Sequence, residues 1–440
     1  MTDRESCRAD AFVEEKKIIQ MWNNRWGYKE AFAIVGIPII IGWVMQLILG
    51  PAPRTAFAFP TNIIAGIAIT LIGVGVALMG KRKGRRPFLA GGPATLSALT
   101  AFMVLTLIVG FTKQIPAGMA AGLSGWFHKI GLSAMLESRA FLLLYAYFLL
   151  VLATATAYRL LRFSLCVRDV AFALNHIGLY LFLLFGLISS SEMRRFTMVL
   201  SSESDQPEWR ATDNLTGAMV ELPLALELKH FDLQEYPPKL MLLDLPTGEL
   251  VPKGRPEHLL IDSTLTRGRL LDWQIEILEH LPLSAPLVGA TDIVFKEFRS
   301  TGGAASVRVR ATRGDEAYEG WVSSGSYLFP YRSLSLADSL AIVMPEREPK
   351  QFTSHIVYYT QAGDVGKYDI RVNHPLRHGN WYSYQLGYDR ERGRWSTTSE
   401  LEIVYDPWLL PVYVGIAMML LGALCLLLGP ISHDKKKEAL

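Results

Sequence analysis

Six long apolar segments limit what this chain can fold into. Each is close to the roughly 17 to 25 residues that a tilted helix needs to cross a bilayer, and the shortest reaches that length if Leu96 and Thr112 join it. The segments are Phe32 to Leu49, Ile63 to Met79, Ala98 to Phe111, Ala140 to Tyr158, Asp169 to Ser190 and Leu409 to Leu428. The sequence therefore predicts a polytopic α-helical membrane protein with about six transmembrane helices.

A polar stretch, Ser191 to Pro407, separates the fifth and sixth segments. The mean hydropathy of +0.23 hides this contrast because it averages the apolar and polar parts. The stretch is long enough to bury a core of its own. The predicted organisation is an N-terminal segment at 1–30, two helices within 31–80, three within 96–190, an inserted domain at 191–407, a final helix at 408–429 and a tail at 430–440.

The inserted domain reads mostly as β-strands. Val220 to Gln234 and Ala305 to Thr312 alternate apolar and polar residues, and aromatic, β-branched stretches follow between Gly, Asp and Asn. These patterns are typical of a sandwich or barrel. Thr264 to Leu281 is expected to form a helix. The fold class is thus six helices with a large β-rich domain between the fifth and sixth.

Lysine and arginine placement predicts the orientation. The cytoplasmic side is expected to hold both termini and the loops after the second and fourth helices, and 191–407 is expected to be extracytoplasmic, in a bacterial inner membrane. The charges on the first side are Arg4, Arg8, Lys16, Lys17, Arg25, Lys29, the KRKGRR run Lys81 to Arg86, Arg159, Arg162, Arg168 and Lys435 to Lys437; the opposite short loops carry Arg54, Lys113, Lys129 and Arg139. The KRKGRR run is read as a topology marker, with nucleic-acid or anionic-lipid binding as the alternative. No cleavable signal is expected at the N-terminus.

Cysteine usage excludes two kinds of chemistry. Cys7 and Cys166 fall on the predicted cytoplasmic side and Cys425 in the last helix, so the inserted domain cannot form a disulfide. No C-x-x-C-H motif occurs, so the chain cannot attach haem to itself in the usual c-type manner.

Catalytic motifs are scarce, and we expect no enzyme activity from this chain alone. Hydrolase, zinc-protease, P-loop and dinucleotide signatures do not occur. His374 and His378 are read as part of a turn between strands, with a metal or haem ligand as the alternative. The remaining histidines, His258, His280 and His355, are read as solvated or core residues, and Asp338, Asp364 and Asp369 show no spacing that suggests acid–base work.

One histidine, His176, lies inside a predicted span. An ionisable group at that depth is a functional candidate, and a neutral imidazole is a good ligand for haem iron. With Asp169 at the cytoplasmic border, His176 would lie about 10 Å into the membrane. The alternative is a histidine bonded to a neighbouring helix through Asn175 or a serine.

Two further positions are weaker candidates for contact with haem. Gly178 and Gly186 lie on roughly one helical face and would allow close approach by a helix or a flat porphyrin, ordinary helix packing being the favoured reading. His128, flanked by Trp126 and Phe127, is read as part of an interfacial aromatic anchor, with a transient haem contact as the alternative.

Several segments together resemble the ResB family, also called CcsB, of cytochrome c biogenesis proteins. The similar segments are Leu99 to Pro116, Ser133 to Arg162, LNHIGLYLFLLFGLISS, VELPLALELKHFDLQEY, VNHPLRHGNWYSYQLGYD and DPWLLPVYVGIAMMLLG, in that order along about Leu96 to Pro430. The first two predicted helices are additional to the usual four. The partner half, ResC or CcsA with its Trp-rich haem-handling loop, does not occur in this sequence.

The resemblance implies a membrane subunit of a System II cytochrome c maturation complex. It implies that His176 and a histidine of a ResC/CcsA-type partner ligate a non-covalent haem b, and that the inserted domain engages apocytochrome c or the partner. Haem attachment is implied only for the complex, and nucleic acid is not an expected partner. Two other classes stay open: an envelope ligand-binding receptor or transporter component, and a membrane redox subunit that binds haem b. The last class normally needs two histidines from its own spans, and only His176 lies within one.

Overall fold

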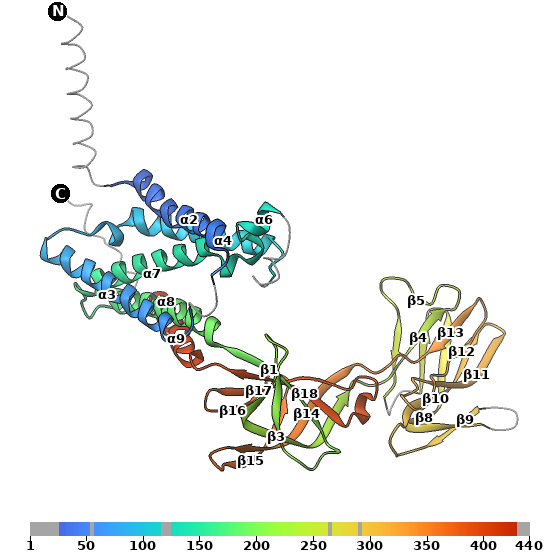
Figure 1. The fold of residues 1–440 in the computed structure, drawn as a ribbon. Helices are drawn as coiled ribbons and strands as arrows, with labels where there is room; N and C mark the ends of the chain where they lie inside the picture. Colours follow the sequence, from blue (N-terminus) through green and yellow to red (C-terminus); the bar gives the residue numbers. More distant parts are fainter. Residues whose placement is uncertain (1–25, 53–56, 116–124, 263–265, 289–292, 429–440) are drawn as a thin grey trace, which may run out of the picture. The chain divides into compact units, whose positions relative to one another are not determined.

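The computed structural model describes residues 26–52, 57–115, 125–262, 266–288 and 293–428. The chain divides into two compact units (Figure 1): a helical unit, up to Met193 and again from Asp406, and a β domain, Arg194–Tyr405. The predicted terminal segments up to residue 25 and from residue 430, together with Cys7, Arg54 and the three tail lysines, lie outside the described residues. The two cysteines that are described, Cys166 and Cys425, are free.

Six helices of the described chain are long and apolar enough to cross a membrane, as the sequence predicts. They are α2 (Tyr28–Leu49), α3 (Thr61–Arg82), α4 (Gly92–Phe111), α7 (Arg139–Leu160), α8 (Val167–Glu192) and α9 (Leu409–Leu428). Short helical turns lie between them: η2 (Phe88–Ala90), α6 (Trp126–Lys129) and η3 (Leu132–Glu137). The helix α4 reaches spanning length because it begins at Gly92, where Pro93 suits the first turn.

The helix α7 forms the centre of the helical unit. Its most apolar stretch is 61 % buried, against 22 % or less for the other five spans. Phe148 of α7 stacks on Phe102 of α4 at 5.1 Å between ring centroids, and the Tyr145 hydroxyl donates to the Leu183 carbonyl of α8 at 2.9 Å. The other spans expose large apolar side chains, as lipid-facing helices do.

Polar side chains connect the first turn of α3, the last turn of α8 and the residues directly before α9. The Glu192 carboxylate accepts from the Asn62 amide at 2.5 Å and from the Trp408 indole at 2.7 Å. The buried Asp406 carboxylate accepts from the Ser189 hydroxyl at 2.9 Å. These charge-assisted bonds fix where the chain leaves α8 and where it enters α9.

The β domain contains one large antiparallel sheet. Its strand order is β15–β14–β3–β2–β1–β18–β17–β16. Its bounds are β1 (Arg194–Ser201), β2 (Glu208–Asp213), β3 (Met219–Glu235), β14 (Pro349–Thr360), β15 (Val365–Arg371), β16 (Leu376–His378), β17 (Trp381–Tyr388) and β18 (Thr398–Tyr405). Alternate residues of these strands form one core, which includes Phe196, Leu226 and Ile403.

Two five-stranded sheets are inserted between β3 and β14 along the chain. The first contains β7 (Arg267–Leu270), β8 (Trp273–Val288), β9 (Ile293–Glu297), β10 (Ala304–Arg313) and β11 (Glu316–Ser323); the second contains β4 (Lys239–Asp244), β5 (Glu249–Val251), β6 (His258–Leu260), β12 (Leu334–Ser335) and β13 (Leu340–Val343). They share a second core, in which Leu242 and Ile342 meet Trp273 and Val307. The sandwich character predicted from the alternating pattern is therefore present.

The prediction of a helix at Thr264 to Leu281 is wrong. The described part of this segment forms β7 and most of β8, joined at Leu271, whose φ is +50°. Trp273 and Ile275 are buried, whereas Gln274 between them is exposed. This two-residue period places the apolar side chains in the second core, and tertiary packing overrides the helix propensity of the leucines and glutamates.

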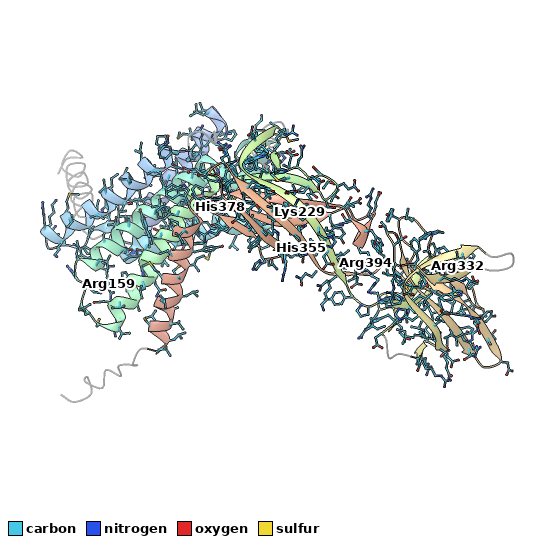
Figure 2. All side chains as sticks on the ribbon, turned by 90° about the horizontal axis from the view of Figure 1, so that it is seen from below. Arg159, Lys229, Arg332, His355, His378 and Arg394 are labelled. Carbon is cyan, nitrogen blue, oxygen red and sulfur yellow. The ribbon has the colours of Figure 1, made fainter. Side chains whose placement is uncertain are left out.

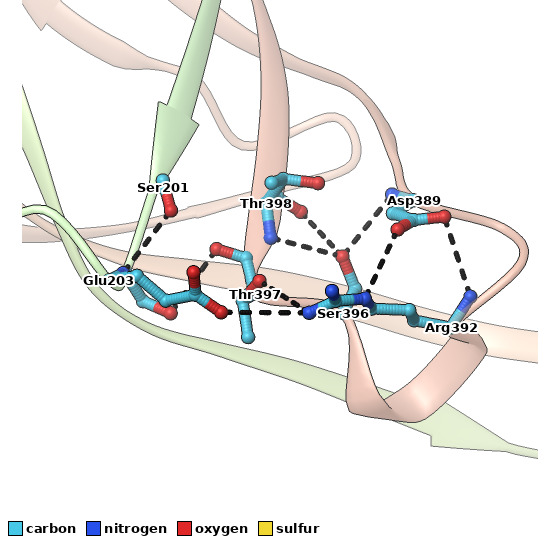
Figure 3. A network of polar contacts seen from close by, with 8 residues as sticks. Ser201, Glu203, Asp389, Arg392, Ser396, Thr397 and Thr398 are labelled. Carbon is cyan, nitrogen blue, oxygen red and sulfur yellow. Dashed lines mark hydrogen bonds and ion pairs between the residues drawn. The ribbon is translucent and has the colours of Figure 1, made fainter. Parts of the chain in front are cut away.

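A polar network closes the turn between β17 and β18, around η4 (Gly393–Trp395) (Figure 3). The Arg392 guanidinium lies 3.5 Å from the Glu203 carboxylate and 3.7 Å from that of Asp389. The Ser396 hydroxyl oxygen accepts from the backbone N–H groups of Asp389 and Thr398, both at 3.2 Å. The network ties this turn to the end of β1.

Candidate functional site: a cavity beside His176

His176 shares one face of α8 with two other residues. Asp169, Phe172 and His176 are spaced three and four residues apart, so they follow one another along the helix surface. Asp169, in the first turn, accepts from the backbone N–H of Ser164 at 3.1 Å and from its hydroxyl at 2.8 Å. A carboxylate there also suits the positive end of the helix dipole.

This face of α8 borders a cavity of about 600 Å³. The volume falls within the range of about 300 to 1,000 Å³ that is typical of ligand sites. The lining comes from the α3–α4 connection, the start of α4, the end of α7 and the start of α8: Arg86, Ala90, Gly92, Thr95, Ala155, Tyr158, Arg159, Arg162, Asp169, Phe172 and His176. Apolar and aromatic walls thus meet one imidazole and several charges.

The Phe172 carbonyl determines which nitrogen of His176 is free. It lies 3.1 Å from Nδ1, and because a carbonyl oxygen only accepts, Nδ1 carries the hydrogen. In the neutral ring, Nε2 then holds the lone pair that a metal needs. The Phe172 ring also stacks on the imidazole with centroids 3.7 Å apart, which restricts its rotation.

Two arginines from the end of α7 are held over aromatic rings of this cavity. The Arg159 guanidinium carbon lies 4.7 Å from the Phe172 ring centroid, and Arg159 pairs with Asp169 at 2.9 Å. Arg162 lies 4.8 Å from the Tyr158 ring centroid and donates to its hydroxyl at 2.7 Å. Figure 2 shows Arg159 among the side chains of the helical unit. Cation–π contacts of this kind orient a guanidinium without using all its donors.

Gly178 lies against α9 and is not among the residues that line the cavity. A Cβ at Gly178 would lie 2.6 Å from the Gly415 carbonyl oxygen and 2.9 Å from Met418 Cβ. Gly178 therefore allows two helix backbones to approach closely. An equivalent Cβ at Gly186 would meet nothing within 4 Å in the described structure.

His128 lies on α6, near the start of α7, whereas the cavity lies near the end of α7. Those two ends are about 30 Å apart along the helix. His128 Nδ1 lies 2.8 Å from the Ser133 hydroxyl, and its ring meets Phe127 edge to face. The structure therefore does not bring His128 and His176 together.

The β-domain histidines have separate surroundings. His374 follows the predicted turn at Asn373 and stacks on Tyr368, and His378 ends β16 beside Tyr358. His258 is exposed on β6 and His280 is half-buried on β8. Within the described ranges, no three His, Cys, Asp or Glu side chains are grouped to hold a metal ion.

His355 does have a charged partner, which the sequence reading missed. Its Nδ1 lies 2.7 Å from the Asp369 carboxylate on the adjacent strand, and its ring stacks on His230 with centroids 5.8 Å apart. The hydrogen bond from His355 lowers the pKa of Asp369 below its usual range, and Arg371 adds to this effect. The strand register that pairs His355 with both His230 and Asp369 cannot be read from the spacing of the three residues.

The helices and the inserted β domain define a multi-pass membrane protein with a large β-rich domain before its last span. A family model described as the ResB-like family matches residues 332–399, from just before β12 to the start of β18. This match, which lies within the β domain, supports the ResB family assignment that the resemblance of the chain's segments predicts. No curated protein matches the chain.

Proposed function

We propose that this chain is the membrane subunit of a System II cytochrome c maturation complex, in which it holds haem beside His176 for transfer across the membrane. The observation that carries the proposal is the cavity in which His176 presents Nε2 while Nδ1 is bonded to the Phe172 carbonyl. An imidazole nitrogen with a free lone pair is a usual axial ligand of haem iron. In this function haem is the cargo of the chain.

The cavity suits the rest of an iron porphyrin as well. Phe172, Tyr158, Ala155 and Ala90 offer apolar surface for the macrocycle, next to the imidazole. The basic residues near the cavity support a position on the cytoplasmic side, because lysine and arginine are enriched in cytoplasmic loops. Haem made in the cytoplasm would reach such a cavity first.

A partner subunit is needed for the second axial ligand. Among the described spans, His176 is the only histidine. We therefore propose that a ResC/CcsA-type membrane protein supplies the other histidine, and that attachment of haem to apocytochrome c takes place in the complex. A redox subunit that keeps haem b between two histidines of its own is disfavoured by the same observation. The β domain, extracytoplasmic in this proposal, would engage apocytochrome c or the partner.

Co-purification with such a partner tests the proposal. The complex should show the absorbance spectrum of b-type haem, the isolated chain should carry little haem, and His176→Ala in the complex should lose the spectrum. His128→Ala is the matched control, because it removes a histidine far from the cavity and should keep the spectrum. Stoichiometric six-coordinate haem in the isolated chain would contradict this division of labour.

A further inference from the structure

The charges that line the cavity do not balance. Three guanidinium groups, those of Arg86, Arg159 and Arg162, face a single carboxylate, that of Asp169. With a neutral His176 the lining therefore carries a net charge of two positive units. All three arginines are exposed residues at the edge of the cavity, so an entering ligand can reach them. The excess positive charge raises the local concentration of ligands with the opposite sign.

Each arginine keeps donors available for such a ligand. A guanidinium has five N–H donors. Among the described residues, Arg86 donates through Nε to the Ala90 carbonyl at 2.7 Å, Arg159 through one terminal nitrogen to Asp169, and Arg162 through one terminal nitrogen to the Tyr158 hydroxyl. The fork geometry of the remaining donors matches carboxylate or phosphate oxygens.

We propose that Arg86, Arg159 and Arg162 form a dianion subsite that makes the cavity specific for porphyrins with two free carboxylates. This inference rests on the proposed function, in which His176 ligates the metal of the porphyrin. A haem has two propionate groups at one edge, so its charge of two negative units equals the excess of the lining. His176 would bind the metal, while the arginines would fix the direction in which the carboxylate edge points.

Anionic lipid is the other source of the same oxyanion chemistry, since basic pockets between membrane helices also bind phosphate headgroups. Two observations favour the porphyrin. The arginines and the imidazole line one cavity, and Phe172 contacts both Arg159 and His176. A lipid phosphate would use the arginines but would have no use for the imidazole beside them.

Zinc protoporphyrin IX tests the subsite in the isolated full-length chain, because zinc in a porphyrin takes a single axial ligand and needs no partner histidine. Its binding to the chain in phosphatidylcholine nanodiscs can be followed by fluorescence and compared with binding of the dimethyl ester, which lacks both charges. We expect the wild-type chain to bind the diacid about a hundredfold more tightly than the ester, about tenfold for each charge-assisted contact.

The double variant Arg86→Gln with Arg162→Gln should lower affinity for the diacid about tenfold to a hundredfold and leave affinity for the ester within about twofold. Arg159 is left in place because its removal would leave Asp169 without its ion pair. The control, Arg85→Gln with Arg168→Gln, removes the same charge from exposed positions that do not line the cavity. It should keep the wild-type preference for the diacid. Unchanged ester binding also reports that the double variant is folded.

Three results would overturn the subsite. If the wild type bound the diacid and the ester equally, in a His176-dependent manner, the proposed function would stand and the subsite would fall. A loss of diacid preference when phosphatidylglycerol is added to the nanodiscs would assign the arginines to lipid. Binding of neither porphyrin, or binding unaffected by His176→Ala, would remove the proposed function and the subsite together.

Discussion

Gly178 of α8 and Gly415 of α9 bring two helix backbones into direct contact. A Cβ on either glycine would lie within 2.7 Å of the other residue's carbonyl oxygen. About two turns further along α9, a Cβ at Gly422 would lie 2.5 Å from the Asn175 amide nitrogen of α8. This face of α8 differs from the face that carries Asp169, Phe172 and His176, so close packing on α9 fixes the rotation of α8 that presents His176 to the cavity.

Gly178→Val should therefore weaken the α8–α9 contact. Its side chain has no space against Gly415 and Met418, and overpacking of this kind costs about 1 to 3 kcal/mol. We expect a lower thermal midpoint of the detergent-solubilised chain and reduced accumulation in the membrane. Gly186→Val is the matched control, because the space beside Gly186 is open in the described structure. Equal midpoints for the two variants would contradict the packing role.

The six spans could be predicted because an apolar segment must have a certain length to cross a bilayer. The cavity could not be predicted from the sequence. Arg86 and Arg159 lie more than seventy positions apart along the chain, and the sequence alone indicates only that each marks a cytoplasmic loop. One signal was available, since Asp169, Phe172 and His176 recur at helical spacing on a single face. The arginines joined them only when α7 and the α3–α4 connection were placed beside α8.

In the β domain, alternation predicted the strands Val220 to Gln234 and Ala305 to Thr312 but not β8. Leucines and glutamates in the β8 segment are good helix formers, and the burial that decides between helix and strand is supplied by Leu242 and Val307 from other strands. The partner of His355 was also hidden, because cross-strand register depends on the whole sheet and not on local spacing.

The orientation of the chain can be tested with fusions and proteases. We expect Ser191 to Pro407 to be cleaved by protease added from the periplasmic side and Lys81 to Arg86 to be protected, because positive loops stay in the cytoplasm. Reporter fusions at the same two places provide an independent measurement. If both methods placed the KRKGRR loop outside, the cavity would open on the wrong side of the membrane for haem entry from the cytoplasm.

Asp369→Asn should change how the β domain responds to acid. The pKa of Asp369 is lowered in the folded state, so its ionised form stabilises the fold at any pH above its ordinary pKa of about 3.9. That contribution is lost as the pH falls through the folded-state value. The effect should be small, because both side chains are partly exposed.

Urea unfolding of the solubilised chain, followed by proteolysis within the β domain, measures this contribution. The wild type should be more stable than Asp369→Asn near pH 6, and the difference should shrink below about pH 4. Because His355 is the main partner of the carboxylate, the double variant with His355→Gln should lose little more than either single variant. A difference that stays constant from pH 6 to pH 3 would speak against the pair.

His176→Ala should abolish production of holocytochrome c while the protein remains inserted and abundant. The alanine removes a coordinate bond that no neighbour can replace, since the Phe172 ring cannot ligate iron and Asn175 faces α9 beside Gly422. A histidine that served only as a hydrogen-bond donor would behave differently, because one polar contact in a membrane is worth about 1 kcal/mol.

Imidazole in the growth medium separates these two cases. Free imidazole can occupy the space left beside Phe172 and supply a nitrogen ligand to iron. Because it is not attached to α8, it does not restore the hydrogen bond within the helix between His176 Nδ1 and the Phe172 carbonyl. We therefore expect partial recovery of holocytochrome c in His176→Ala with imidazole, and none in Gly178→Val, where the defect is helix packing. Two results would rule out His176 as a haem ligand. One is cytochrome maturation at near wild-type levels in His176→Ala without imidazole, and the other is inactivity that is explained by loss of the protein.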